Sequence, residues 1–255
     1  MGPPLRPSTE DLAHYRPVAG RHGSLRVLIL GVTPELHRLP WPERAGVVAV
    51  DHTRAMIQAV WPGPPGSAVV GEWTDLPVGS ASCHVALCDG GMHLLDHLDG
   101  QRALAESLAR VVVPGGTFVT RLFVPPAEPE RPEAVLDDLL AGGVANVNLL
   151  KMRLLMSLQA DPVAGVELAA AWKALNRACP DYGELARRIG WRAEDLAAVD
   201  TYRDCPIRYH FVTVEDVRRL FCVEPGGGFD LVSVDVPSYE LGDRCPTVHL
   251  RRRAR

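Results

Sequence analysis

The turn at residues 31–35 carries side chains that could select a small cofactor. Gly31 follows a branched apolar run, and a ligand that presses against the carboxyl edge of a parallel sheet needs a small residue there. Pro34 removes one backbone N–H donor that a pyrophosphate would use. Glu35 adds negative charge, and two like charges about 4 Å apart cost about 4 kcal/mol at an effective dielectric constant of about 20. The turn therefore disfavours a nucleotide diphosphate and suits a cofactor with a free amino group and no phosphate.

Residues 89–97 contain candidates for acid–base chemistry. Asp89 ends an apolar run, and His93 follows four residues later. An unperturbed histidine has a pKa of about 6.5, which suits a general base at neutral pH, so His93 is the candidate catalytic residue. Packing at the start of a following helix explains His93 equally well. His97 completes a His-x-x-x-His spacing, but no third ligand lies near it in the sequence, and no metal site is predicted.

The elements that would position these residues alternate along the chain. Short branched apolar runs are typical of strands buried on both faces, and such runs lie at 25–31, 46–51, 67–73, 84–91 and 116–124. The segments 51–60 and 100–112 between them read as helices. Strands and helices that alternate at this spacing predict an α/β fold, a Rossmann-like doubly wound sheet that is mostly parallel.

The pattern changes after the proline-rich segment 124–133. Residues 133–200 contain no strand-like run and read as helices, and strand-like segments return near the chain end. A helical cap is therefore expected between strands five and six. The predicted regions are an N-terminal helical segment (1–24), a Rossmann-like core (25–125), the helical cap (126–205) and C-terminal strands that complete the sheet (206–255).

Several motifs, taken in order, resemble those of class I S-adenosylmethionine-dependent methyltransferases. VLILGVTPE is similar to the first motif of this family and VVAVDHTRAMIQAV to the second. VVGEWTDLPVGSASCHVALCDGGMHLL is similar to the third and fourth together, and LARVVVPGGTFV to the step into the fifth strand. Each match alone is weak, but their common order is specific. The resemblance covers residues 25–124 and about 206–251, and it implies an antiparallel last strand and S-adenosylmethionine as the cofactor.

The resemblance also implies roles for the residues that follow each strand. Asp51 would accept hydrogen bonds from both ribose hydroxyls, Met56 would pack against adenine, and Glu72 with Trp73 would read the adenine edge. Taken singly, a helix N-cap at Asp51, core packing at Met56 and Trp73, or a turn at Asp89 explains these residues as well. The implied cofactor-binding set is Gly31, Thr33, Glu35, Asp51, His52, Met56, Glu72, Trp73, Asp89 and Gly90.

The first motif departs from the family at two positions, where Thr33 and Glu35 replace glycines. A threonine hydroxyl can still hydrogen-bond the cofactor's carboxylate, but a β-branched residue disfavours positive φ. The alternative to an enzyme is therefore a non-catalytic binding or scaffold protein on the methyltransferase fold.

Selection of the methyl acceptor would fall to the cap and to the segment that leaves it. Arg203 would favour a carboxylate or another anion. Arg121 lies on a predicted strand, where burial without a partner is costly, so it either pairs with an acid inside the fold or contacts the acceptor. For Asn148 and Arg153, exposure to solvent is equally probable. The candidate substrate-binding residues are Arg121, Asn148, Arg153, Tyr202, Arg203 and Tyr209.

Composition limits the class of partner. The net charge is −4, and residues 126–205 carry nine basic and thirteen acidic residues, whereas nucleic-acid binders carry a basic face. No apolar run reaches the length of a membrane span, no secretory signal is recognised, and six scattered cysteines read as reduced thiols. The resemblance implies an enzyme that methylates an O, N or C nucleophile of a small molecule, in secondary metabolism. Together with these limits of composition, it leads us to expect a cytoplasmic protein without nucleic-acid or membrane partners, with a homodimer left open.

Overall fold

The computed structural model describes residues 3–20 and 25–254. These residues form two compact units. The core unit comprises residues 7–124 and 212–254, and the helical unit comprises residues 3–6 and 125–211. Within the described ranges, the structure contains no helix that is both long enough and apolar enough to cross a membrane.

The core unit is built on a seven-stranded sheet with the order β3-β2-β1-β4-β5-β9-β8. Five strands are parallel neighbours, whereas β9 lies between β5 and β8 and runs antiparallel to both. The strands are β1 (Arg26–Leu30), β2 (Gly46–Asp51), β3 (Ala68–Val70), β4 (Cys83–Asp89), β5 (Val112–Arg121), β8 (Phe229–Asp235) and β9 (Thr247–Arg252).

The central strand β1 explains how the sheet is held together. Its apolar side chains alternate between two hydrophobic clusters: Val27 and Ile29 face one, and Leu28 and Leu30 face the other. All four side chains are almost completely buried, and each buried side chain of this size contributes about 1.5–3 kcal/mol through the hydrophobic effect. A strand buried on both faces reads as a continuous apolar run, which is why the sequence predicts it.

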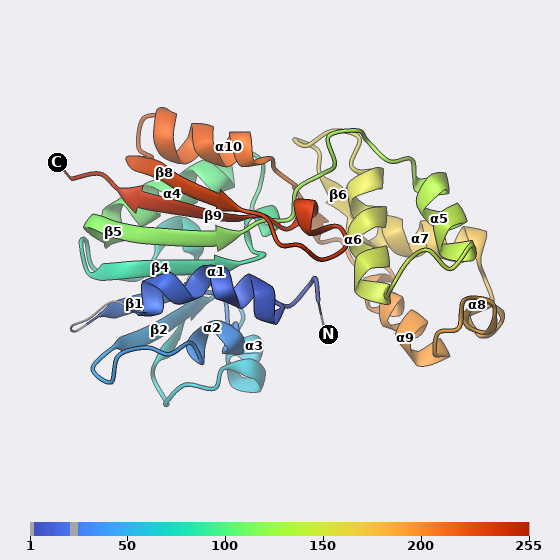
Figure 1. Ribbon diagram of the computed structural model, residues 1–255, viewed down its shortest axis with the longest axis horizontal. Coiled ribbons are helices and arrows are strands. Elements are labelled where there is room, and N and C mark those ends of the chain that lie inside the picture. Colours follow the sequence, from blue (N-terminus) through green and yellow to red (C-terminus); the bar gives the residue numbers. More distant parts are fainter. Residues whose placement is uncertain (1–2, 21–24, 255) are drawn as a thin grey trace. The chain divides into compact units, whose positions relative to one another are not determined.

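Helices cover both faces of this sheet. Tyr15 and Val18 of α1 belong to one cluster, and Leu104 and Leu108 of α4 belong to the other, so α1 and α4 lie on opposite faces (Figure 1). The α-helices of the core unit are α1 (Thr9–Ala19), α2 (Pro34–His37), α3 (Arg54–Val60), α4 (Asp99–Val111) and α10 (Val214–Arg218). Short 3-10 turns are η1 (Trp73–Asp75), η2 (Met92–Leu94) and η5 (Gly242–Arg244), and a π-helical turn is η4 (Arg219–Val223).

The fold class predicted from the sequence is confirmed, including the antiparallel last strand. Element boundaries differ in detail. The fifth strand begins at Val112, so Pro114 and Gly115 lie inside it, and not before it as expected. The helix expected from residue 51 begins at Arg54, because the side chain of Asp51 binds the backbone of the turn that follows β2.

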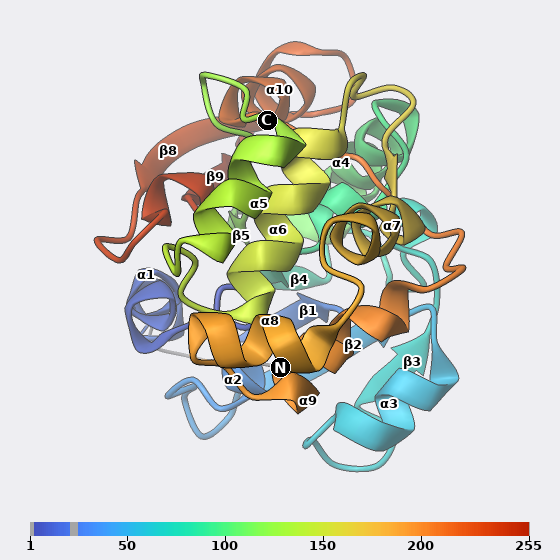
Figure 2. The same ribbon diagram turned by 90° about the vertical axis from the view of Figure 1, so that its right-hand side faces the viewer.

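The helical unit consists mainly of helices, of which α5 and α6 lie side by side (Figure 2). The expectation that residues 133–200 lack strands was wrong, because β6 pairs with β7 in a two-stranded antiparallel sheet. Residues 206–211 therefore remain with the helical unit. Its elements are α5 (Pro132–Leu140), α6 (Val147–Leu158), β6 (Val166–Glu167), α7 (Leu168–Ala178), α8 (Tyr182–Ile189), α9 (Ala193–Ala197), η3 (Ala198–Tyr202) and β7 (Arg208–Tyr209).

Candidate functional site

The carboxyl ends of the central parallel strands bring the predicted cofactor residues to one edge of the core unit. Gly31 follows β1, Asp51 ends β2 and Asp89 ends β4. Because these strands are parallel neighbours, their carboxyl ends meet at the same edge, where ligands of open α/β sheets bind. A cavity of about 200 Å³ lies there, lined by His52, Glu72, Trp73, Leu94 and Leu95.

In the turn after β1, residues 31–35, only Gly31 has a positive φ. Gly31 has φ +83°, a left-handed conformation that a side chain makes costly. Thr33 has φ −92° and is the residue before the short helix α2, which begins at Pro34. A β-branched residue adopts that conformation without strain, so the replacement of a family glycine by Thr33 does not distort the turn. Glu35 lies in the first turn of α2 and is partly buried.

Asp51 ends β2 at this edge, and its carboxylate lies beside the turn that follows β1. Its side chain is largely buried, and Oδ1 accepts a hydrogen bond of 2.8 Å from the Thr53 N–H. Oδ2 lies 4.0 Å from the point where a Cβ on Gly31 would stand, so this oxygen borders the turn. The neighbouring His52 side chain is 67% exposed, and Met56 on α3 is 46% exposed.

Trp73 lines the cavity at this edge of the sheet and packs beneath the turn after β1. Its Nε1 donates a hydrogen bond of 2.8 Å to the Val50 carbonyl oxygen, and its ring lies 3.5 Å from the Cβ position of Gly31. A Cβ on Gly91 would stand 2.8 Å from the same ring, so the indole fills the space that both glycines leave. Glu72, directly before it, is exposed.

Asp89 does not present its carboxylate to the cavity. Arg121 donates to it from Nε (2.7 Å to Oδ1) and from Nη2 (3.1 Å to Oδ2), and both side chains are buried. Of the two roles that the sequence left open for Arg121, the structure therefore shows a pairing with an acid inside the fold. Gly90, at φ +61°, packs against Phe123, whose ring would be 2.9 Å from a Cβ there.

Two N-terminal residues that were not predicted from the sequence contact this buried pair. Tyr15 on α1 donates from its hydroxyl to the Cys88 carbonyl oxygen (3.0 Å) and to Asp89 Oδ1 (3.2 Å). Asp11, one turn earlier, lies 3.6 Å from Arg121 Nη1. Burial, and then the Asp89 carboxylate, raise the pKa of Tyr15 well above its usual value, so the phenol stays a donor. In the sequence, only the i, i+4 spacing of Asp11 and Tyr15 could have indicated that these two side chains lie on one face of a helix.

His93 is buried within η2, in contact with the Phe123 ring at a centroid distance of 5.2 Å. Burial, and then the Arg121 guanidinium, lower the pKa of His93 to about 3. The expectation of a base with a pKa of about 6.5 is therefore corrected, because at neutral pH the imidazole is neutral and weakly basic.

The predicted acceptor residues other than Arg121 all lie in the helical unit. Arg153 is engaged by Glu130, 2.7 Å from its Nη2, and by Asp138. Arg203 stacks over the Trp172 ring at 4.9 Å, and Tyr209 lies on β7. Tyr202 is buried, and burial followed by Tyr209 raises its pKa.

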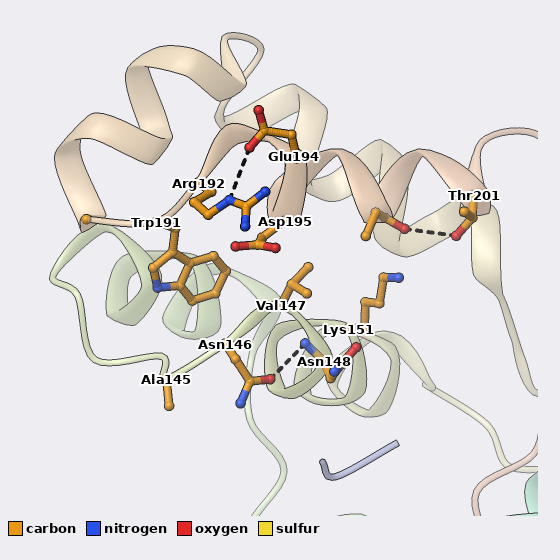
Figure 3. Close-up of a pocket in the computed structure, with 12 residues that line it drawn as sticks. Ala145, Asn146, Val147, Asn148, Lys151, Trp191, Arg192, Glu194, Asp195 and Thr201 are labelled. Carbon is orange, nitrogen blue, oxygen red and sulfur yellow. Dashed lines mark hydrogen bonds and ion pairs between the residues drawn. The ribbon is translucent and has the colours of Figure 1, made fainter. Parts of the chain in front are cut away.

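Asn148 has a different surrounding. It lines a cavity of about 640 Å³ that belongs to the helical unit alone (Figure 3). Of the candidate acceptor residues, Asn148 is the one on that cavity wall. The structure thus groups Gly31, Asp51, His52, Glu72 and Trp73 at one edge of the core unit, and it distributes the acceptor candidates among several environments.

No protein-family model matches the sequence, and none of the curated proteins is similar enough to count as a relative. Solved structures share the fold. A protein named as a zinc-dependent alcohol dehydrogenase from Rhodobacter sphaeroides superposes with a TM-score of 0.59 at 15% identity, over 98% of this chain and 92% of its own. An S-adenosylmethionine-dependent methyltransferase from Mesorhizobium loti gives 0.53 at 14% identity, over 96% and 98%.

A third similar structure is the protein named as a methyltransferase in complex with the Trm112 methyltransferase activator of Haloferax volcanii, with a TM-score of 0.56 at 12% identity, over 96% of this chain and 90% of its own. The antiparallel strand β9 between β5 and β8 agrees with the last strand that the methyltransferase resemblance implied. The chain has a class I methyltransferase fold. The TM-scores of 0.53–0.59 show a shared fold, and at identities of 12–15% this likeness says nothing about the reaction.

Proposed function

We propose that the protein is an S-adenosylmethionine-dependent methyltransferase that acts on an O, N or C nucleophile of a small molecule. The observation that carries this proposal is the grouping of Gly31, Asp51 and Trp73 at the carboxyl edge of a sheet with the class I methyltransferase fold. This fold would hold the cofactor with three features: the left-handed glycine Gly31, the acid Asp51 at the end of the second strand, and the Glu72–Trp73 pair after the third strand.

The residues present fit S-adenosylmethionine better than a dinucleotide. Asp51 keeps Oδ2 toward the Gly31 turn and could accept from a ribose hydroxyl. Pro34 lacks the backbone N–H that a pyrophosphate would use, and the negative charge of Glu35 would repel it. The same charge on Glu35 would attract an amino group. The exposed Met56 side chain would cover the adenine. Most ligand sites exceed 300 Å³, so the cavity of about 200 Å³ would enclose only part of the cofactor.

When bound, the cofactor supplies an electrophilic methyl group on a sulfonium. The chain's own contribution would then be alignment, which is worth up to about 7–11 kcal/mol for well-oriented reactants. The Asp89–Arg121 pair would hold the backbone of Gly90 in place, and Asp89 is thus a positioning residue. Because the pKa of His93 is about 3, His93 is a poor base, and the acceptor should already be nucleophilic at neutral pH.

The net charge supports a small acceptor over RNA. The chain carries −4 overall, and binding to a polyanion needs a cluster of Lys and Arg on one face. A non-catalytic binding protein is the second candidate function, and it is motivated by the Thr33-Pro34-Glu35 departure from the family's first motif.

Calorimetric titration with S-adenosylmethionine tests the proposal. We expect micromolar binding by the wild type and loss of binding by Asp51→Ala. The matched control is Asp75→Ala, because Asp75 is an acid on the neighbouring turn η1 whose side chain is 96% exposed. NAD and a short RNA at low salt are titrated alongside.

Each outcome decides between named functions. Binding that Asp51→Ala abolishes and Asp75→Ala leaves intact supports the methyltransferase. Binding of NAD in place of S-adenosylmethionine would favour redox chemistry like that of the dehydrogenase-like neighbour. Failure to bind either cofactor would overturn the enzyme proposal in favour of the binding protein.

A further inference from the structure

The cavity of about 640 Å³ in the helical unit has the size of a small-molecule site. One wall comes from α6, which contributes Val147, Asn148 and Lys151, and Figure 3 shows the segment 191–201 on the other side. Apolar surface is supplied by Val147 and by the half-buried indole of Trp191. The cavity lies within a single unit, so its geometry is independent of the core unit.

Lys151 is an unusual residue on this wall, because its side chain is only 6% exposed although it ends in an ammonium group. Its Nζ stands 4.7 Å from the centroid of the Tyr202 ring, and among residues 3–20 and 25–254 no carboxylate lies within ion-pair distance of this ammonium. An ammonium has three N–H donors, and a π-face satisfies them only in part. Burial accordingly lowers the pKa of Lys151.

The neighbouring cation on α6 shows the contrast. Arg153, two residues further, is also buried, and Glu130 and Asp138 both bind its guanidinium. The described residues therefore supply acids for Arg153 and none for Lys151, which lines the cavity. An anionic ligand in the cavity would provide the negative charge that the described part of the chain does not place beside Lys151.

The start of α6 strengthens the positive potential of this wall. Asn146 caps the helix, and its Oδ1 accepts from the backbone N–H groups of Asn148 and Leu149 at 2.9 and 3.0 Å. Asn146 and Val147 also line the cavity, so the positive end of a twelve-residue helix dipole opens on it. The dipole and the Lys151 ammonium favour the same sign of ligand charge.

The other wall limits how much negative charge a ligand can carry. Arg192 and Glu194 form an ion pair at 3.4 Å, which leaves the Asp195 carboxylate as a further charge on that side. Asp195 would repel a second anionic group. A ligand with a single carboxylate and an apolar body therefore fits these charges better than a dianion such as a phosphate monoester.

We propose that this cavity is a binding site for a small organic monocarboxylate, with the carboxylate at Lys151 and the apolar body against Val147 and Trp191. The inference stands on the helical unit alone and goes beyond the proposed methyl transfer. Calorimetry with S-adenosylmethionine therefore fails or succeeds independently of it.

The chain offers a direct readout, because it contains only two lysines, Lys151 and Lys173. Full-length protein labelled with ¹³C-lysine should give two sets of side-chain signals, and the exposed Lys173 serves as the internal control. The probe is 3-phenylpropionate, and its neutral analogue 3-phenylpropanamide matches it in shape. We expect the propionate to shift the Lys151 Cε signal and to raise the pKa of Lys151, with no change at Lys173.

Two variants complete the test by calorimetry with the same probe. Lys151→Met keeps the length of the side chain without its charge and should lower the affinity for 3-phenylpropionate at least tenfold, whereas Lys173→Met should leave it unchanged. Equal shifts with propionate and amide, or equal effects at both lysines, would overturn a carboxylate site. The absence of any shift at millimolar probe would overturn the site altogether.

Discussion

Trp73 Nε1 donates a hydrogen bond of 2.8 Å to the carbonyl oxygen of Val50, and this oxygen also accepts the backbone N–H of Gly31 at 2.8 Å. One acceptor thus connects the end of β2, the turn after β1 and the turn η1 after β3. These two hydrogen bonds add to the ladders that already join β1 to β2 and β2 to β3. They help to fix the positions of Gly31 and Trp73 beside the end of β2.

The first prediction concerns this shared acceptor. Trp73→Phe keeps an aromatic ring and removes the indole donor, so it should lower the free energy of unfolding by about 1 kcal/mol and weaken binding of S-adenosylmethionine. Trp61→Phe is the matched control, because Trp61 Nε1 donates to Ser67 Oγ at 2.9 Å, away from the cavity. Urea unfolding and calorimetry measure both effects. Equal loss of cofactor affinity in the two variants would contradict the role of Trp73.

A second prediction separates backbone strain from ligand approach. Gly31 and Gly66 both have φ +83°, so alanine at either position should cost about 1–2 kcal/mol of stability. A Cβ at Gly66 meets nothing within 4 Å, whereas one at Gly31 enters the space beside Asp51 and Trp73. Gly31→Ala alone should therefore weaken binding of S-adenosylmethionine. A comparable loss of affinity in Gly66→Ala would show that strain, and not access, is responsible.

A third prediction concerns the buried pair of Arg121 and Asp89. Arg121→Met leaves Asp89 and Asp11 buried without their cation, and breaking a buried pair in this way costs about 3–5 kcal/mol. The control is Arg218→Met, which removes an exposed partner of Glu215 and should change stability by about 0–1 kcal/mol. Chemical denaturation distinguishes these values. A similar small loss in both variants would mean that the buried pair contributes little.

A fourth prediction follows from the lowered pKa of His93. In the unfolded chain this imidazole takes up a proton near pH 6.5, but the folded chain takes it up only near pH 3. Between these values the unfolded state binds more protons, so the free energy of unfolding falls as the pH falls, by up to about 1.4 kcal/mol per pH unit. His93→Gln should flatten this dependence in denaturation experiments at pH 7, 6 and 5.

His52→Gln is the control for the pH experiment, because the His52 side chain is 67% exposed. Substitution at this exposed position should change the free energy of unfolding at pH 7 by no more than about 0.5 kcal/mol. If His93→Gln and the wild type lose stability in parallel as the pH falls, the folded protein protonates His93 in the ordinary range, and His93 is again a candidate base.

The strands of the core unit could be predicted because burial on two faces leaves a continuous apolar run, as in β1. The strand β6 could not be predicted, because its two residues are too few to show a periodic pattern. It is a strand only because it pairs with β7. The position of Asp51 was predictable for a similar reason: an acid that ends a buried strand must lie at the edge of the sheet.

Partners distant in sequence explain most of what the sequence did not predict at the site. Arg121 is 32 residues from Asp89 and 106 from Tyr15, and no local pattern shows that the three meet. The pKa of His93 is lowered first by burial and then by the Arg121 guanidinium, and neither can be seen in the local sequence. At Thr33, the family pattern suggested a conflict with β-branching, which the extended backbone at that residue removes.

The place of β9 in the sheet affects how the chain can fold during synthesis. On the ribosome, β5 emerges long before Thr247–Arg252, its antiparallel partner. Until then one edge of β5, with buried residues such as Phe118 and Val119, is open to pairing with other chains. The nascent protein must therefore hold an unfinished sheet while the whole helical unit is made.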